Sequence, residues 1–170
     1  LISDDVDTSY SWKIPLNLAN YITETDKAIC TISCETYNDD TLIGSKNVSV
    51  TLKVPSNIIP PITSINVTEA SQISLEGYVE GKSKLNVVIN ASGVYGSVIK
   101  TVTSTLNGVV YKELSFITET LDFNTNKNLD VTVTDSRGRK NTTSVSITPM
   151  AYKAPKILKF NVNRCLQDGT

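Results

Sequence analysis

Leu129-Asp130-Val131-Thr132-Val133-Thr134-Asp135-Ser136-Arg137-Gly138 is the stretch that decides the fold. Its apolar residues alternate with polar ones, which is the period of a strand with one buried face. The last four residues are of the types that form turns, and alternation resumes beyond them at Val145 and Ile147. The stretch therefore predicts a strand that ends in a hairpin turn, followed by an antiparallel partner.

The same period of two recurs along the chain. Three further runs have it: Ala28/Cys30/Ile32/Cys34, Val48/Val50/Leu52/Val54 and Leu85/Val87/Ile89/Ala91. Asn107-Gly108 lies between apolar runs and predicts a two-residue hairpin, because both turn positions need a positive φ. No amphipathic helix is evident, although residues 16–22 could hold one short helical turn. We therefore expect an all-β protein.

Prolines divide the chain into repeating units. Residues 62–67 follow Pro60-Pro61 and residues 157–162 follow Pro155, and both read apolar-x-x-apolar-Asn-Val at an offset of 95 residues. That period suits tandem immunoglobulin-like β-sandwich modules of roughly 100 residues. We expect a shorter or partial β module at 1–55, a complete sandwich at 56–155 and the first strand of a further module at 156–170. In the complete sandwich, strands are predicted near 62–69, 84–91, 98–106, 109–113, 115–120, 128–134 and 141–148.

Composition excludes several classes of function. The chain has 16 basic and 17 acidic residues and a net charge of −1, which does not suit binding to nucleic-acid phosphates. No apolar run is long enough for membrane insertion. Histidine is absent, which removes Ser–His and Cys–His nucleophiles and imidazole metal sites. We expect no enzyme, no catalytic residues and no cofactor.

The three cysteines predict free thiols. Cys30 and Cys34 lie on one face of a strand roughly 13 Å apart, which is too far for a disulfide. Cys165 belongs to a different module. We expect Cys30 and Cys34 to be small apolar core residues.

Three groups of residues are candidate binding sites. Arg137, Arg139 and Lys140 cluster at a hairpin tip, where they form either a contact for an acidic surface polymer or a solvated turn that blunts edge pairing. The oxygen-bearing series from Asp122 to Asp130 resembles a calcium loop but has Lys127 where glycine is needed, so we assign no metal. A carbohydrate platform would need aromatic side chains such as Tyr78, Tyr95 and Tyr111.

Seven segments together resemble tail-associated minor structural proteins of siphophages and prophages of Gram-positive bacteria. The resemblance covers nearly the whole chain in order. The segments are 12–15 (WKIP), 31–37 (TISCETY), 42–46 (LIGSK), 81–85 (GKSKL), 91–100 (ASGVYGSVIK), 133–139 (VTDSRGR) and 164–170 (RCLQDGT). It implies an immunoglobulin-like repeat region of a virion tail component, assembled in the bacterial cytoplasm, and no motif of catalytic or binding residues.

The expected function is that of a non-enzymatic spacer rod, with possible host adhesion. Its partners would be other tail proteins, host cell-wall polysaccharide or teichoic acid, and further copies of the chain in the virion. Two alternatives stay open. A bacterial cell-surface adhesin repeat would need an export signal and a wall anchor in the full gene, and a carbohydrate-binding accessory module would need an aligned aromatic strip on one sheet.

Overall fold

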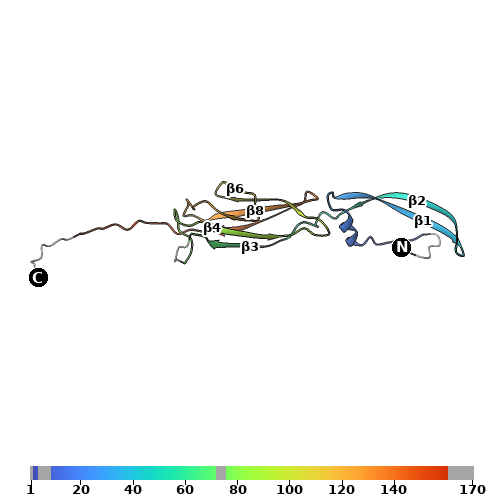
Figure 1. The fold of residues 1–170 in the computed structure, drawn as a ribbon, viewed down its shortest axis with the longest axis horizontal. Helices are drawn as coiled ribbons and strands as arrows, with labels where there is room; N and C mark the ends of the chain where they lie inside the picture. Colours follow the sequence, from blue (N-terminus) through green and yellow to red (C-terminus); the bar gives the residue numbers. More distant parts are fainter. Residues whose placement is uncertain (1, 4–8, 72–75, 161–170) are drawn as a thin grey trace, which may run out of the picture.

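The chain is an all-β protein with several antiparallel sheets and almost no helix. A computed structural model describes residues 2–3, 9–71 and 76–160. The described part of the molecule is elongated, with a long hairpin at one end, a unit of two sheets in the middle and a segment without strands that runs out to residue 160 (Figure 1). The elements are η1 (Leu16–Tyr21), β1 (Lys27–Asn38), β2 (Thr41–Lys53), β3 (Ile62–Glu69), β4 (Leu85–Ala91), β5 (Ile99–Leu106), β6 (Val109–Tyr111), β7 (Ser115–Ile117), β8 (Lys127–Asp135) and β9 (Lys140–Ile147).

The middle of the molecule, which we call the two-sheet unit, comprises β3 to β9. One sheet has the strand order β3-β4-β7 and the other β6-β5-β8-β9, and every pair is antiparallel. The inward side chains of both sheets form one apolar core, whose fully buried members include Leu85, Val87, Leu129, Val131 and Val133. Alternation in the sequence therefore becomes one buried face on each sheet.

The first part of the molecule, which we call the hairpin unit, comprises η1, β1 and β2. The two strands are long, at 12 and 13 residues, and within the described residues they pair only with each other. The unit has a small core of its own, made by Ala19, Ile22 and Val54. Most of the hairpin beyond that core is exposed on both faces.

The sequence located the elements well. Strands predicted at 62–69, 84–91 and 128–134 lie at Ile62–Glu69, Leu85–Ala91 and Lys127–Asp135, and the short helical turn forms as η1. Asn107 and Gly108 have φ values of 46° and 85° between β5 and β6, which confirms the predicted hairpin.

The predictions about the cysteines and the C-terminus have different outcomes. Cys30 and Cys34 are free thiols, but Cys30 is only half-buried and Cys34 is exposed, so the expectation of two core residues is wrong. The reason is that no second sheet of the described chain covers β1 and β2. Residues 156–160 carry no strand, while Cys165 and the rest of the predicted further module lie in 161–170, outside the described residues. No helix in the described parts is long and apolar enough to cross a bilayer.

Candidate functional site

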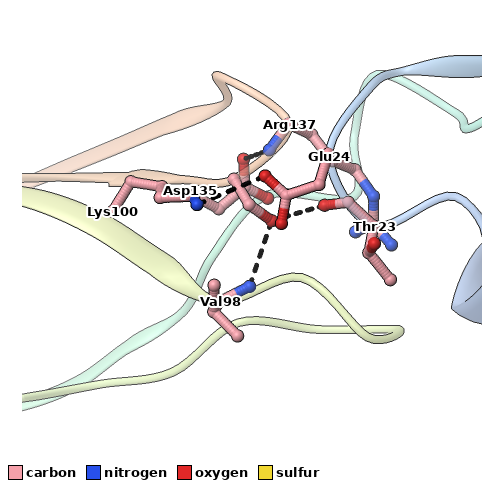
Figure 2. Close-up of polar contacts among 7 residues, drawn as sticks. Thr23, Glu24, Val98, Lys100, Asp135 and Arg137 are labelled. Atoms are coloured by element: carbon pink, nitrogen blue, oxygen red, sulfur yellow. Dashed lines mark hydrogen bonds and ion pairs between the residues drawn. The ribbon is translucent and has the colours of Figure 1, made fainter.

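The candidate site is the joint where the hairpin unit meets the two-sheet unit. Four segments come together there: residues 19–24 at the end of η1 and just beyond it, residues 54–60 between β2 and β3, residues 92–98 between β4 and β5, and the β8–β9 turn at 135–139. Figure 2 shows residues of the β8–β9 turn facing the segment that contains Thr23 and Glu24. The contacts across the joint are polar and mostly involve backbone carbonyl groups.

Asp135 shapes the β8–β9 turn. Its side chain is 1% exposed, and its Oδ1 accepts hydrogen bonds from the backbone N–H groups of Arg137, at 3.0 Å, and Arg139, at 2.9 Å. The backbone N–H of Asp135 also donates to the carbonyl of Arg139, at 2.9 Å. An aspartate that satisfies the N–H groups two and four residues ahead fixes a tight turn. Arg137 is thereby directed at the hairpin unit, and Arg139 is directed at the linker between β2 and β3.

Arg137 is the central residue of the joint. It is only 7% exposed, and its guanidinium donates to four backbone carbonyls. Two belong to the hairpin unit: Nε donates to Ile22 at 2.6 Å and Nη2 to Ala19 at 2.9 Å. The other two belong to the loop before β5, where Nη1 donates to Val94 at 2.8 Å and Nη2 to Tyr95. The planar fork of donors allows one side chain to bind both units at once.

Arg139 binds the segment that links the two units. Its Nη2 donates to the carbonyl of Val54 at 2.6 Å, and its Nη1 donates to those of Ile58, at 3.0 Å, and Pro55. Asn141 extends the same seam, because its Nδ2 donates to the carbonyl of Pro60 at 2.9 Å. The linker is therefore held against the two-sheet unit over most of its length.

Further contacts surround Arg137. The hydroxyl of Ser136 donates to the carbonyl of Thr23 and accepts from the N–H of Val98 at 3.2 Å (Figure 2). Lys100 and Glu24 form an ion pair at 3.3 Å, but both side chains are more than half exposed, so it contributes little.

A close approach of the two units explains one glycine. Gly96 has φ +77°, and a Cβ atom there would lie 2.9 Å from the carbonyl oxygen of Asn20. That distance is too short for a side chain, and L residues rarely adopt this φ. The loop before β5 therefore approaches the backbone of η1 as closely as a glycine allows.

The electrostatics of the joint are those of a buried cation. Desolvation lowers the pKa of Arg137 below its ordinary value, the neighbouring Asp135 carboxylate opposes this, and Arg139 lowers the pKa further. An arginine stays protonated under such a shift, because its ordinary pKa lies far above neutral pH. The four carbonyl dipoles replace the water that the charge has lost. A buried charge held this way fixes geometry, and removing it leaves several carbonyls without donors.

Comparison with known proteins assigns the chain to a protein family. Residues 1–169 match the family described as "Siphovirus protein of unknown function (DUF859)". The chain belongs to this family. No curated protein matches the siphovirus protein significantly, and no solved structure does. The family membership agrees with the siphophage part of the resemblance seen in the sequence.

The structure separates the three cations that the sequence grouped at an exposed tip. Arg137 is buried, Arg139 is partly buried, and Lys140 is exposed at the start of β9. Both sequence interpretations placed all three side chains in solvent, which is wrong for Arg137. The predicted contact with a surface polymer stays a prediction, although the two guanidinium groups already have carbonyl partners in the siphovirus protein.

The other candidate residues have local partners. In the series from Asp122 to Asp130, the Asp122 carboxylate accepts from Asn107, Asn124 donates to Glu80, and Asn126 accepts from Ser146. Within the described residues no group of three His, Cys, Asp or Glu side chains is arranged to hold a metal ion.

The three tyrosines lie in different local environments. Tyr78 donates to the carbonyl of Val67, and Tyr111 stacks on Phe116 with ring centroids 4.3 Å apart. Tyr95 lies in the loop at the joint, where its carbonyl accepts from Arg137. These contacts belong to the fold of the unit and of the joint.

Sequence reasoning missed the joint itself. The turn residues were visible, but their partners are main-chain carbonyls, which every residue carries and which therefore leave no pattern in a sequence. One usable signal was present: two arginines flank a glycine, and the first of them lies two residues after an aspartate that ends a buried strand.

Proposed function

We propose that the siphovirus protein is a structural segment of the phage tail, in which immunoglobulin-like modules are joined into a stiff spacer. Three observations support the proposal. They are family membership, the strand order of the two-sheet unit and the joint. The joint carries most of the argument, because it bears directly on stiffness.

The two-sheet unit supports the immunoglobulin-like part of the proposal. Its seven strands, taken in chain order, place the first, second and fifth in one sheet and the third, fourth, sixth and seventh in the other. An immunoglobulin constant-type sandwich has this arrangement except that its fourth strand pairs with the first sheet. Here β6 pairs with β5 instead. This strand order supports the proposal that the unit is a variant of that sandwich.

The joint supports the stiffness. Modules linked only by a flexible chain sample many orientations, because interfaces within a chain are small and polar by default. Here Arg137 holds Ala19 and Ile22, Arg139 holds the linker, and Pro55 and Pro60 restrict the linker backbone. These contacts oppose bending in more than one direction, so neighbouring modules keep one orientation.

Distances between two labels test the stiffness. In a chain with all three cysteines replaced by serine, spin labels on Ser45→Cys of β2 and Ser144→Cys of β9 report the orientation of the units. Both positions are exposed and lie on different units. We expect a narrow distance distribution for the otherwise unchanged chain and a broad one after Arg137→Ala with Arg139→Ala. Lys140→Ala is the matched control, and it should leave the distribution narrow.

Two outcomes would refute the spacer proposal. The first is a broad distribution in the unchanged chain, which would mean that the carbonyl contacts do not fix the orientation. The second is an equally narrow distribution in the double variant. Placement in the tail has its own test, because antibodies against the two-sheet unit should decorate the tails of purified virions in electron micrographs. Labelling of heads alone would contradict the tail assignment.

Host contact is the finer part of the proposal. Cell-wall polysaccharide and teichoic acid are the surface polymers of the hosts expected from the resemblance. Because Arg137 and Arg139 are engaged in the joint, we expect the segment alone to stay in solution when mixed with Gram-positive cell walls. Saturable co-sedimentation would overturn that expectation. Its loss in Lys140→Ala would then locate the contact, since this variant leaves the joint intact.

A further inference from the structure

One face of the β1–β2 hairpin is apolar and largely uncovered. Strand register places three cross-strand pairs on this face, Ala28 with Leu52, Cys30 with Val50 and Ile32 with Val48. We call it the apolar hairpin face. It is half-buried near η1, but toward the tip Ile32 is 37% exposed and Val48 is 52% exposed.

The β8–β9 hairpin shows what normally covers such a face. Its inward residues Leu129, Val131 and Val133 are fully buried, and Ile147 is 1% exposed. They share one core with Leu85, Val87 and Phe116 of the opposite sheet, β3-β4-β7. An apolar hairpin face in this chain is therefore covered by a three-stranded sheet with alternating aliphatic residues.

The two hairpins are copies in the same repeat. Residues 22–25 and 117–120 both read Ile-Thr-Glu-Thr, and their offset of 95 residues equals that of the segments 62–67 and 157–162. The offset also relates Val50 to Val145 and Leu52 to Ile147 in the second strand of each hairpin. Agreement at three separated places indicates that residues 22–54 correspond to the last part of the two-sheet unit.

Strand register confirms the correspondence. Val50 pairs with Cys30, and its counterpart Val145 pairs with Leu129, so Cys30 corresponds to Leu129. Cys30 lies five positions after the end of the first Ile-Thr-Glu-Thr segment, and Leu129 lies nine positions after the end of the second. In the first copy, the segment from Cys30 to Val50 is longer by the same four residues than the segment from Leu129 to Val145 in the second copy. The offset of 95 residues is therefore restored in the second strand of the hairpin. Cys30 and Ile32 thus occupy positions that are fully buried at Leu129 and Val131.

We infer that β1 and β2 are the closing hairpin of a preceding module, and that the first sheet of that module covers the apolar hairpin face. The occupant is an antiparallel pair of strands with alternating Val, Ile and Leu residues, like β3 and β4; the offset of 95 residues places the counterpart of β7 at residues 20–22, at the end of η1. It is carried by the same polypeptide on the N-terminal side of the hairpin. This inference rests on the proposed tandem-module function and extends it by naming the partner of the hairpin unit.

Physical reasoning favours such a cover. A two-stranded hairpin is marginally stable in water, and a long one with free edges pairs with other chains. The base of this hairpin is also loosely packed, since a hollow of about 360 Å³ lies between the Ile14–Ile22 segment and the end of β2. A covering sheet would bury the exposed valine and isoleucine and would fill this space. The expected role of Cys30 and Cys34 as core residues would then hold in the complete module.

Thiol labelling tests the inference. Two chains are compared, the 170-residue chain and the product of the same gene extended at its N-terminus by one repeat, both with Cys165→Ser. Each is treated with N-ethylmaleimide under native conditions, and labelling of Cys30 and Cys34 is followed by peptide mass spectrometry. Cys34 is exposed in the shorter chain and should react readily. In the extended chain we expect its labelling to be slower by about 100-fold or more, because it would require local opening of a core.

Matched variants keep the test independent of folding failures. Ile32 lies on the apolar hairpin face, whereas Ile29 lies on the opposite face and is 79% exposed. In the extended chain Ile32→Asp should lower the melting temperature strongly and Ile29→Asp should not. In the 170-residue chain both changes should have small effects.

Several outcomes would overturn the inference. Equal labelling rates in the two chains would show that nothing upstream covers the face. Slow labelling of the shorter chain, together with sedimentation as a dimer, would show that a second copy covers it instead. A full-length gene that encodes no strands of alternating apolar residues upstream of this segment would also overturn the inference. A flexible joint in the distance measurement would refute the spacer proposal but would leave the labelling difference intact, so the two proposals can fail separately.

Discussion

Arg137→Ala is the sharpest perturbation of the siphovirus protein. It removes two hydrogen bonds that span the joint, from the guanidinium to Ile22 at 2.6 Å and to Ala19 at 2.9 Å. A hydrogen bond made by a charged group contributes about 1.5–3 kcal/mol, so the two together hold the joint closed by roughly 3–6 kcal/mol. Solvent screening is small because the side chain is 7% exposed. At about 1.4 kcal/mol per tenfold, this corresponds to roughly 10²–10⁴ in the closing equilibrium.

Native-state hydrogen exchange measures that equilibrium. The amide of Ile22 is bonded to the carbonyl of Ala19, which is itself an acceptor of Arg137, so its exchange reports opening of the joint. We expect its protection to fall by about 100-fold or more in Arg137→Ala, while the amides of β4 keep theirs because they lie in the core of the two-sheet unit. Arg137→Lys should fall nearly as far, since one ammonium cannot reach four carbonyls.

The control for this experiment is Lys140→Ala, which removes an exposed cation three residues away and should leave the Ile22 amide as protected as before. Protection of Ile22 that is unchanged in Arg137→Ala, with β4 intact, would refute the reasoning. It would mean that Arg139 and the prolines hold the orientation without help from Arg137. A simultaneous loss in β4 would instead show that the turn stabilises the whole unit.

Three other changes have defined outcomes. Gly96→Ala should weaken the joint by about 1–2 kcal/mol and lower the melting temperature, because a Cβ atom at this positive φ would meet the carbonyl of Asn20. Gly44→Ala is the control, because Gly44 has open space around it. Leu85→Ala should destabilise the two-sheet unit by about 2–5 kcal/mol in chemical denaturation. Burial raises the pKa of Glu69, but hydrogen bonds from serine hydroxyls and backbone N–H groups outweigh this and hold the pKa below its ordinary value. The stabilisation by the Glu69 carboxylate is therefore fully present above pH about 4.3 and is lost as the pH falls through the lower folded-state pKa. When melting temperature is measured against pH, the Glu69→Gln variant should therefore show a smaller drop in acid than the unchanged chain.

The sequence predicted the strands because their cause is local. Alternation at Leu129, Val131 and Val133 requires only that one face be buried, and Asn107-Gly108 requires only two positive φ values. Both conditions can be judged from neighbouring residues. The same reasoning failed at Cys34, where an alternating strand has no partner sheet within the described chain. Periodicity shows which face is apolar but does not supply the group that covers it.

The sequence by itself determined the all-β character, the 95-residue spacing of similar segments and the turns at Asn107-Gly108 and 135–138, because these follow from side-chain period and backbone preference. Only the tertiary structure decided that Arg137 and Arg139 are joint residues and not an exposed basic tip. The physical reason is that their partners are backbone carbonyls up to 118 residues away in the chain. Such acceptors have no residue identity, so only the folded arrangement of the two units brings them within reach of a guanidinium group.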